Sequence, residues 1–234
     1  MHAVMEELIK LHEVGCTFKA RQGFMRLKSY TALRDISFSV NRGETLGVIG
    51  SNGAGKSTLL KLLGGIIRPD TGTISFKKDI SISLLNLQMG FAAELSGRTN
   101  ALISSMLMGF SRKEAEERLD KIIAFAELED WADSAIKTYS TGMKARLGFA
   151  VAFEMTPDVL LIDEVLGVGD KQFQKKSATV MKEKIASDKF ASVFVSHSIP
   201  TVQELCTRVL WLDKGEIKAI GPTDEVVKKF NAAD

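Results

Sequence analysis

Short apolar runs recur along the chain and are separated by longer stretches of mixed polarity. Thr45–Ile49, Val159–Ile162 and Ala191–Val195 are dominated by apolar, β-forming residues, as in strands that are covered on both faces. Ile36–Val40 alternates apolar and polar residues, as a half-buried strand does. Other strands are expected at Thr73–Phe76, Ile80–Leu85 and, as the last one, Arg208–Asp213. Because helical stretches separate these strands, the pattern predicts an α/β fold with a largely parallel sheet.

The pattern becomes helical between about residues 90 and 154. Ser111 and Glu114 have the spacing of a capping box at a helix start. Apolar residues then recur at three- and four-residue steps down one helix face, at Ala115, Leu119, Ile122 and Ala126. Shorter helices are expected over Ser57–Leu63 and from about Ile199 to Thr207. With no internal repeat and only four prolines, the chain is expected to be one compact unit with an inserted helical block.

Composition adds mainly exclusions. The chain has 234 residues, 45% of them apolar and 26% charged, which is typical of a globular protein and excludes disorder and collagen-like repeats. A net charge of +2 argues against a nucleic-acid binder, in which basic charge is usually concentrated. Cys16 and Cys206 cannot supply a disulfide framework or a paired zinc site. We expect both to be small buried residues in a reducing compartment.

No segment is long enough to span a membrane. The longest apolar candidates, Leu59–Ile67 and Ala101–Phe110, are far shorter than the roughly 20 residues that a spanning helix needs. The first ten residues contain two glutamates and lack the apolar core of a signal peptide. The sequence therefore predicts a cytoplasmic protein that reaches any membrane only through a partner.

The segment after Thr45–Ile49 matches the phosphate-loop pattern G-x-x-x-x-G-K-[ST]. Its residues are Gly50, Ser51, Asn52, Gly53, Ala54, Gly55, Lys56 and Ser57, followed by Thr58. Glycines allow successive backbone N–H groups to face phosphate oxygens, and the following helix offers its positive end. Lys56 is expected to bind the β- and γ-phosphates and the Ser57 hydroxyl to bind Mg²⁺. A glycine-rich turn that merely precedes a lysine is the alternative, but the strand before it and the helix after it favour ATP or GTP binding.

Two carboxylates end the apolar strand at Val159–Ile162. Asp163 is expected to help hold Mg²⁺ beside the phosphate loop. Glu164 is expected to polarise the attacking water as general base. An exposed acidic turn after a core strand is the alternative interpretation.

Two further motifs are weak when taken alone. Tyr139 to Lys144, with the sequence YSTGMK, places a hydroxyl and a glycine at a helix start, which is either an anion site or an ordinary cap. His197 follows the strand Ala191–Val195 and is either a structural histidine or a neighbour of the phosphates at the same sheet edge.

The order of these motifs resembles that of the nucleotide-binding subunit of ABC transporters, over about Leu8 to Phe230. The resemblance implies a P-loop NTPase fold: a RecA-like, mostly parallel core, an N-terminal antiparallel β subdomain and an inserted helical subdomain. It implies one nucleotide-binding domain over 1–234, with the core and β subdomain at about 1–88 and 156–234 and the helical subdomain at about 90–155. In that family two ATP molecules with Mg²⁺ are held head to tail in a dimer.

Site roles carry over by motif position. The resemblance implies that Ser140, Thr141, Gly142 and Met143 act in trans on the partner's nucleotide, although the family's usual LSGGQ is YSTGM here. Asp170 ends the loop through which the two sites communicate, and His197 matches the switch histidine at the γ-phosphate. Gln88 is the nearest candidate for the glutamine that joins Mg²⁺ and contacts the membrane partner, with an ordinary polar loop residue as the alternative. Phe18 fits best as the adenine-stacking aromatic, although Lys19–Lys28 is longer than the usual stretch before the next strand.

The residues of several motifs resemble those of the subgroup that exports polysaccharides such as capsule, O-antigen or teichoic acid. These motifs are YSTGM, DEVLGVGD, FVSHS, the FAEL run at Phe125–Leu128 and the segment Glu94–Asn100. The resemblance implies an ATPase homodimer that drives a separate permease, with two permease copies, at the cytoplasmic face of the inner or plasma membrane. It implies no nucleic-acid partner. Residues Leu102–Phe110 are candidates for docking the permease, and core packing explains them equally well.

Two other functions remain open at this stage. The first is a transporter ATPase for another substrate, in drug or lipid efflux or in import. The second is an ABC-type ATPase acting on ribosomes or DNA, although such relatives usually carry two cassettes or a long coiled-coil insert.

Overall fold

The computed structural model describes residues 6–22, 26–84, 90–163, 170–185 and 190–233. Contacts divide the chain into two compact units. The first, the sheet unit, comprises residues 1–80, 158–164 and 187–234, and the second, the helical unit, comprises residues 81–157 and 165–186. The sequence interpretation groups 156–234 with the core, whereas by contacts the segment 165–186 belongs with the helices.

The sheet unit contains most of the strands. Its strands are β1 (Glu7–Gln22), β2 (Arg26–Asn41), β3 (Thr45–Ile49), β4 (Thr71–Phe76), β6 (Val159–Asp163), β7 (Ala191–Val195), β8 (Arg208–Asp213) and β9 (Glu216–Pro222). Its helices are α1 (Lys56–Leu63), α6 (Ile199–Leu205) and α7 (Thr223–Asn231). The helical unit contains β5 (Ile82–Leu84), α2 (Gly97–Leu107), α3 (Arg112–Ala126), α4 (Thr141–Glu154) and α5 (Lys171–Ile185), with 3₁₀ turns at Glu129–Trp131 and Ile136–Thr138.

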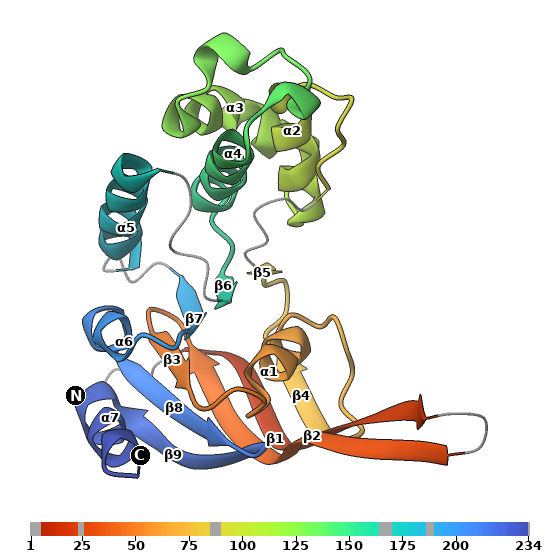
Figure 1. The fold of residues 1–234 in the computed structure, drawn as a ribbon, viewed down its shortest axis with the longest axis vertical. Helices are drawn as coiled ribbons and strands as arrows, with labels where there is room; N and C mark the ends of the chain where they lie inside the picture. The colour runs from red at the N-terminus through yellow and green to blue at the C-terminus, as the bar shows by residue number, and fades with distance from the viewer. Residues whose placement is uncertain (1–5, 23–25, 85–89, 164–169, 186–189, 234) are drawn as a thin grey trace. The chain divides into compact units, whose positions relative to one another are not determined.

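A largely parallel sheet forms the core of the sheet unit, as predicted. Strands β6, β7, β3 and β8 lie side by side in that order and run parallel, and β9 adds antiparallel to β8. Every residue of β3 and β7 is buried, which explains their continuous apolar character. Because these strands are parallel, β3, β6 and β7 all end at the same edge of the sheet (Figure 1).

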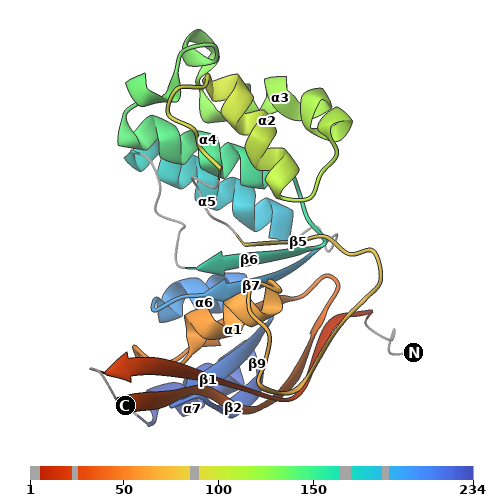
Figure 2. The same cartoon turned by 90° about the vertical axis from the view of Figure 1, so that its right-hand side faces the viewer.

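The N-terminal sheet is antiparallel, with the order β2-β1-β4. Strands β1 and β2 pair along their whole length, from Glu7 with Asn41 to Gln22 with Arg26. Most of the stretch from Lys19 to Lys28 is therefore strand, and not a connection before the next strand. Helix α1 contacts both β2 and the parallel strands β6 and β7, so it lies between the two sheets (Figure 2).

The expectation that Arg208–Asp213 is the last strand is wrong. Lys214 and Gly215 adopt positive φ angles of 48° and 81°, and they form the tight turn of a hairpin between β8 and β9. Helix α7 then packs against both of these strands. A two-residue turn that ends in glycine is a recognisable hairpin signal, and the sequence interpretation missed it.

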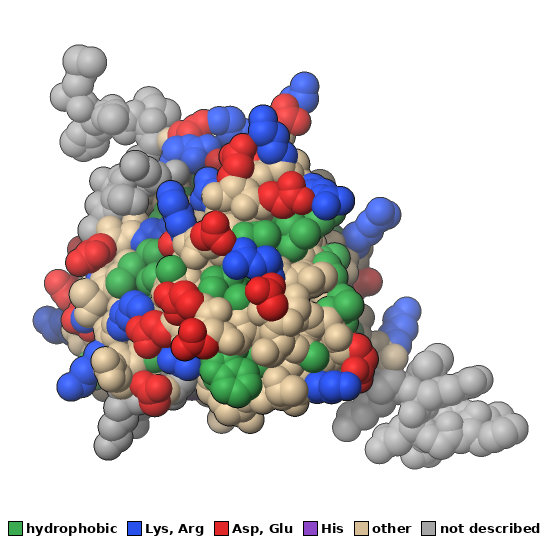
Figure 3. All heavy atoms as spheres, turned by 90° about the horizontal axis from the view of Figure 1, so that it is seen from above, with side chains coloured by type: hydrophobic (Ala, Val, Ile, Leu, Met, Phe, Trp, Pro, Cys, Tyr) green, Lys and Arg blue, Asp and Glu red, His purple; other side chains and the backbone are tan. Residues whose placement is uncertain are grey.

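Helices α2, α3 and α4 pack on one another in the helical unit. The predicted capping box of α3 is present: the Ser111 hydroxyl accepts from the Glu114 N–H at 3.3 Å, and the Glu114 carboxylate accepts from the Ser111 N–H at 2.9 Å. The predicted apolar stripe of α3 is buried. On the face shown in Figure 3, acidic and basic side chains are interspersed and apolar side chains lie between them in small groups.

The two cysteines are buried thiols, as predicted. Burial raises the pKa of Cys206 to about 12. Among the described helices, none is both long and apolar enough to cross a bilayer.

Candidate functional site

The loop that follows β3 has a backbone that only glycine accommodates at two positions. Gly50 and Gly55 have φ angles of 148° and 108°. A Cβ on Gly50 would lie 2.0 Å from the Leu212 carbonyl oxygen, and one on Gly55 would lie 2.6 Å from that of Ala32. The loop can therefore take this tight course only with glycines, as the phosphate-loop pattern predicts.

The Lys56 ammonium folds back over this loop. Its Nζ donates to the carbonyl oxygens of Gly50 at 2.7 Å and Ser51 at 2.9 Å, and the residue is 7% exposed. Lys56 also begins α1, so its charge lies at the positive end of that helix. A cation, a helix N-terminus and a glycine-rich backbone together favour binding of a phosphate group.

A pocket of about 580 Å³ opens beside the loop, entirely within the sheet unit. It is lined by Tyr30, Ala32, Asn52, Gly53, Gly55, Lys56, Ser57, Thr58, Asp163, Val195 and His197. Three segments predicted to meet at one sheet edge therefore contribute to one cavity. Its volume falls in the range of ordinary ligand pockets.

Two oxygen ligands suited to a hard cation lie together in this pocket. The Ser57 hydroxyl donates to Asp163 Oδ2 at 3.4 Å. A hydroxyl and a carboxylate beside a phosphate-binding loop match the preference of Mg²⁺ for oxygen ligands shared with phosphates. The residues present therefore fit this metal.

His197 lies in the turn after β7, exposed at the pocket wall. The turn is shaped by Ser196, whose buried hydroxyl accepts from the Ser198 N–H at 3.0 Å. Glu164 and Gln88, the expected base and the expected second magnesium ligand, lie outside the described residues.

Tyr30 is a pocket residue that the sequence analysis missed. It lies in β2, opposite Phe18 of β1, and its hydroxyl donates to the Gly53 carbonyl at 3.0 Å. Tyr30 is among the residues that line the pocket, and Phe18 is not. The assignment of Phe18 to adenine stacking stays a prediction. No local sequence pattern indicates which of these two paired residues lies against the phosphate loop.

The YSTGM segment opens α4 in the helical unit. Ser140 is the N-cap, and its hydroxyl accepts from the Met143 N–H at 3.2 Å. Thr141 and Gly142 form the first turn. Among described atoms, a Cβ on Gly142 would meet only the Ser140 hydroxyl, at 3.8 Å. Packing within the described chain therefore does not require glycine there.

Tyr139 explains why this segment begins with YS. Its hydroxyl donates a hydrogen bond to the Trp131 carbonyl oxygen at 2.6 Å, and its buried ring packs edge-on against the Trp131 ring. A Cβ on Gly97 would lie 2.0 Å from that hydroxyl. The first residue of α2 must therefore be glycine because the residue before the Ser140 cap is tyrosine.

We expect Gly97→Ala to destabilise the protein by about 1–3 kcal/mol, the usual cost of overpacking. The double variant Gly97→Ala/Tyr139→Leu should lose less than the sum of its single variants, because the shorter side chain removes the clash. Chemical denaturation measures all three differences. Gly221→Ala is the control, since its methyl would approach no described atom closer than 3.8 Å. Wild-type stability of Gly97→Ala would contradict the steric explanation.

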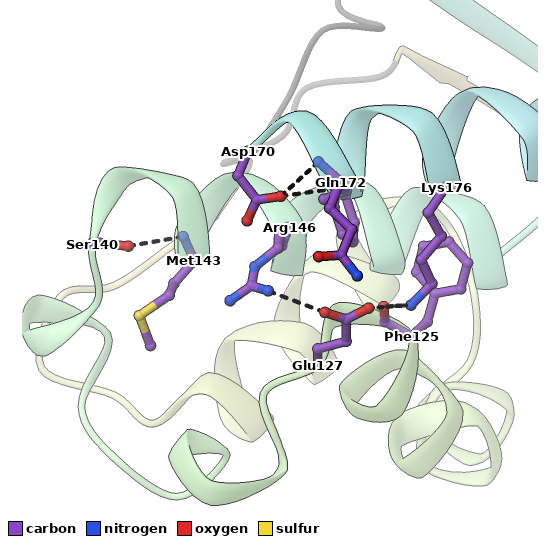
Figure 4. A network of polar contacts seen from close by, with 9 residues as sticks. Phe125, Glu127, Ser140, Met143, Arg146, Asp170, Gln172 and Lys176 are labelled. Atoms are coloured by element: carbon purple, nitrogen blue, oxygen red, sulfur yellow. Dashed lines mark hydrogen bonds and ion pairs between the residues drawn. The ribbon is translucent and has the colours of Figure 1, made fainter.

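Asp170 caps the start of α5, also in the helical unit. Its Oδ1 accepts from the N–H groups of Phe173 at 2.9 Å and Gln172 at 3.0 Å. The hydrogen bond from the Phe173 backbone N–H lowers the pKa of this carboxyl most, and the Arg146 guanidinium lowers it further. Figure 4 shows Asp170, Arg146 and Ser140 in one view of the helical unit.

Comparisons with known proteins agree with these features. Residues 33–167 match the family model described as ABC transporter. The chain is 38% identical to the "O-antigen export system ATP-binding protein RfbB" of Klebsiella pneumoniae, over 98% of this chain and 96% of that protein. It is 43% identical to the "Teichoic acids export ATP-binding protein TagH" of Lactococcus lactis, over 87% of this chain and 43% of that longer protein.

The fold is also that of a solved cassette. The "dimeric structure of a post-hydrolysis state of the ATP-binding cassette MJ0796 bound to ADP and Pi" superposes with a TM-score of 0.73. The match covers 92% of this chain and 99% of that one at 22% identity, and it therefore concerns the fold.

Proposed function

Because the chain belongs to the ABC transporter family, we propose that it is the ATPase subunit of an exporter that moves a lipid-linked polysaccharide through a separate permease. Family membership establishes an ATP-binding, ATP-hydrolysing cassette. The observation that supports this chemistry most directly is that Lys56, Ser57, Asp163 and His197 line one and the same pocket. The names of the Klebsiella and Lactococcus relatives, which refer to export of O-antigen and of teichoic acids, support the polysaccharide substrate.

At the nucleotide, the Gly50–Gly55 backbone and Lys56 are proposed to hold the phosphates. Lys56 would exchange its bonds to two loop carbonyls for bonds to phosphate oxygens, which are stronger because both partners are charged. Ser57 and Asp163 would hold Mg²⁺, which neutralises charge that develops on the phosphates. Glu164 is proposed as the base for water, and His197 as the γ-phosphate contact. Tyr30 is proposed to form the wall of the pocket beside the nucleobase of ATP.

Two copies are proposed to close head to tail around ATP. Ser140 to Met143 of one copy would then face the nucleotide held by the other. Gly142 supports this, since no described neighbour in its own chain requires a glycine. A close approach from outside the chain would account for it. Asp170 is proposed to communicate between the two sites.

The permease would dock on the helical unit at the cytoplasmic face of the inner or plasma membrane. Helix α2 packs Ala101, Ser104 and Ser105 inward. It leaves Met106 45% exposed and Leu107 57% exposed. These two side chains are the proposed docking residues from the segment Leu102–Phe110.

Affinity purification from detergent-solubilised membranes tests the partner. We expect an integral membrane protein to co-purify with the wild-type chain and to be recovered poorly with Met106→Ser/Leu107→Ser. Recovery of ribosomes or DNA instead would favour the alternative soluble ATPase.

Replacement of Lys56 with alanine in the native cell tests which substrate the transporter exports. The expected result is loss of surface polysaccharide with accumulation of lipid-linked polymer inside. An unchanged polysaccharide with a changed lipid or drug profile would favour the alternative transporter.

A further inference from the structure

Glu127 lies just after α3 and has an unusual backbone. Its φ and ψ angles are 57° and 51°, the left-handed conformation that glycine normally takes at a helix C-terminus. A residue with a Cβ adopts this conformation at a cost in free energy, which contacts elsewhere can offset. Glu127 belongs to the FAEL run, which the ATPase chemistry does not use.

The Glu127 side chain joins two other helices. Oε1 accepts from Lys176 Nζ of α5 at 2.7 Å, and Oε2 pairs with Arg146 of α4 at 3.4 Å. Figure 4 shows this carboxylate between the two cations. One side chain at the end of α3 therefore ties α4 to α5.

Both cations are also held by other groups around Glu127. Lys176 Nζ donates to the Phe125 carbonyl at 3.0 Å and lies 4.9 Å from the centre of the Phe125 ring. The Arg146 guanidinium lies 6.0 Å from the centre of the Phe173 ring and contributes to lowering the pKa of Asp170. Removal of Glu127 would leave two neighbouring cations without the anion that they share.

Each cation belongs to a helix whose first turn has a proposed role. Arg146 lies within two turns of Ser140, the cap of α4. Lys176 follows Asp170, the cap of α5, at a similar spacing. A shift of either helix would change its distance to Glu127.

We propose that Glu127 is a positioning residue that fixes the first turns of α4 and α5 relative to each other. Glu127 does not line the nucleotide pocket and is not one of the residues proposed to bind ATP in trans. The proposal rests on the proposed function, since the roles of those first turns in hydrolysis are themselves proposed. The Glu127 side chain is 49% exposed, and exposed ion pairs add little to stability. We therefore expect the Glu127 ion pairs to affect the relative positions of α4 and α5 more than the stability of the protein.

The test variant is Glu127→Gly, which suits the left-handed backbone and removes the carboxylate. We expect unchanged or slightly higher thermal stability and unchanged ATP affinity of the dilute monomer. The kcat for ATP hydrolysis should fall about two- to thirtyfold, the range of effects that residues acting at a distance produce. Hydrogen exchange should become faster at the Met143 and Phe173 amides, which the two caps protect. Glu127→Gln, which keeps length and loses charge, should show an intermediate effect.

Asp79→Gly is the matched control. Asp79 has a φ of 58° and belongs to the sheet unit, whereas α4 and α5 belong to the helical unit. This change should leave hydrolysis and both amides as in the wild type.

Two results would overturn the positioning role. The first is wild-type exchange at both amides in Glu127→Gly, and the second is a loss of activity accompanied by an equal loss of stability. The exchange measurement needs no ATP, so it is independent of whether the proposed function is correct. Failure of the wild-type chain to dimerise or to hydrolyse ATP would instead count against the proposed function.

Discussion

Replacement of Lys56 with alanine is expected to lower the rate of ATP hydrolysis by about 10²–10³-fold. The ammonium is nearly buried and lies against the loop carbonyls, so its partners are already arranged around a fixed positive charge. Because the same cation contacts the phosphates before and during the reaction, ATP binding should weaken as well. Phosphate release and a nucleotide titration measure the two effects.

Lys61→Ala is the control for this prediction. Lys61 belongs to the same helix but is exposed on its outer face. Its removal should leave both quantities within experimental error. If Lys56→Ala hydrolysed ATP at the wild-type rate, the proposed role of the loop would be wrong.

The second large effect is expected at Glu164. Glu164→Gln should lower hydrolysis by about 10²–10⁴-fold, the usual contribution of a general base. ATP binding should persist, because the amide keeps the size of the side chain and the phosphate contacts are made elsewhere. The variant should therefore accumulate as an ATP-bound dimer. Size-exclusion chromatography with and without ATP, together with phosphate release, measures both outcomes.

Glu225→Gln provides a matched control, since Glu225 lies exposed at the start of α7. Undiminished hydrolysis by Glu164→Gln would assign the base to another residue. Loss of ATP binding in the same variant would mean that Glu164 holds the nucleotide or the metal.

The parts of the fold that short patterns specify were predictable. Buried parallel strands produce continuous apolar runs, so β3, β6 and β7 were expected close to their actual bounds. The phosphate loop is one contiguous motif. The placement of Asp163 and His197 in its pocket follows from the rule that parallel strands end at one edge.

The parts that depend on distant contacts were not predictable. Tyr30 of β2 meets Gly53 of the phosphate loop, and the sequence alone does not specify that contact. The packing of Tyr139 against Gly97 joins residues that are far apart in sequence. The left-handed backbone of Glu127 conflicts with the local preference of a residue that has a Cβ. Cations on two other helices bind its side chain, and a local pattern does not show them. Such conflicts between local and global preference mark positions that merit functional tests.

In the proposed dimer, one copy supplies the phosphate loop and a second copy supplies the first turn of α4. Two variants test it in one measurement: Lys56→Ala, which damages the loop, and Gly142→Asp, which places a carboxylate at that first turn. Each should be nearly inactive alone. In a mixed head-to-tail dimer, one site carries both changes and the other carries neither. An equimolar mixture should therefore recover up to about one quarter of the wild-type rate of phosphate release, since half the dimers are mixed and half their sites are intact. A mixture no more active than the two variants measured separately would contradict the head-to-tail arrangement of the two copies.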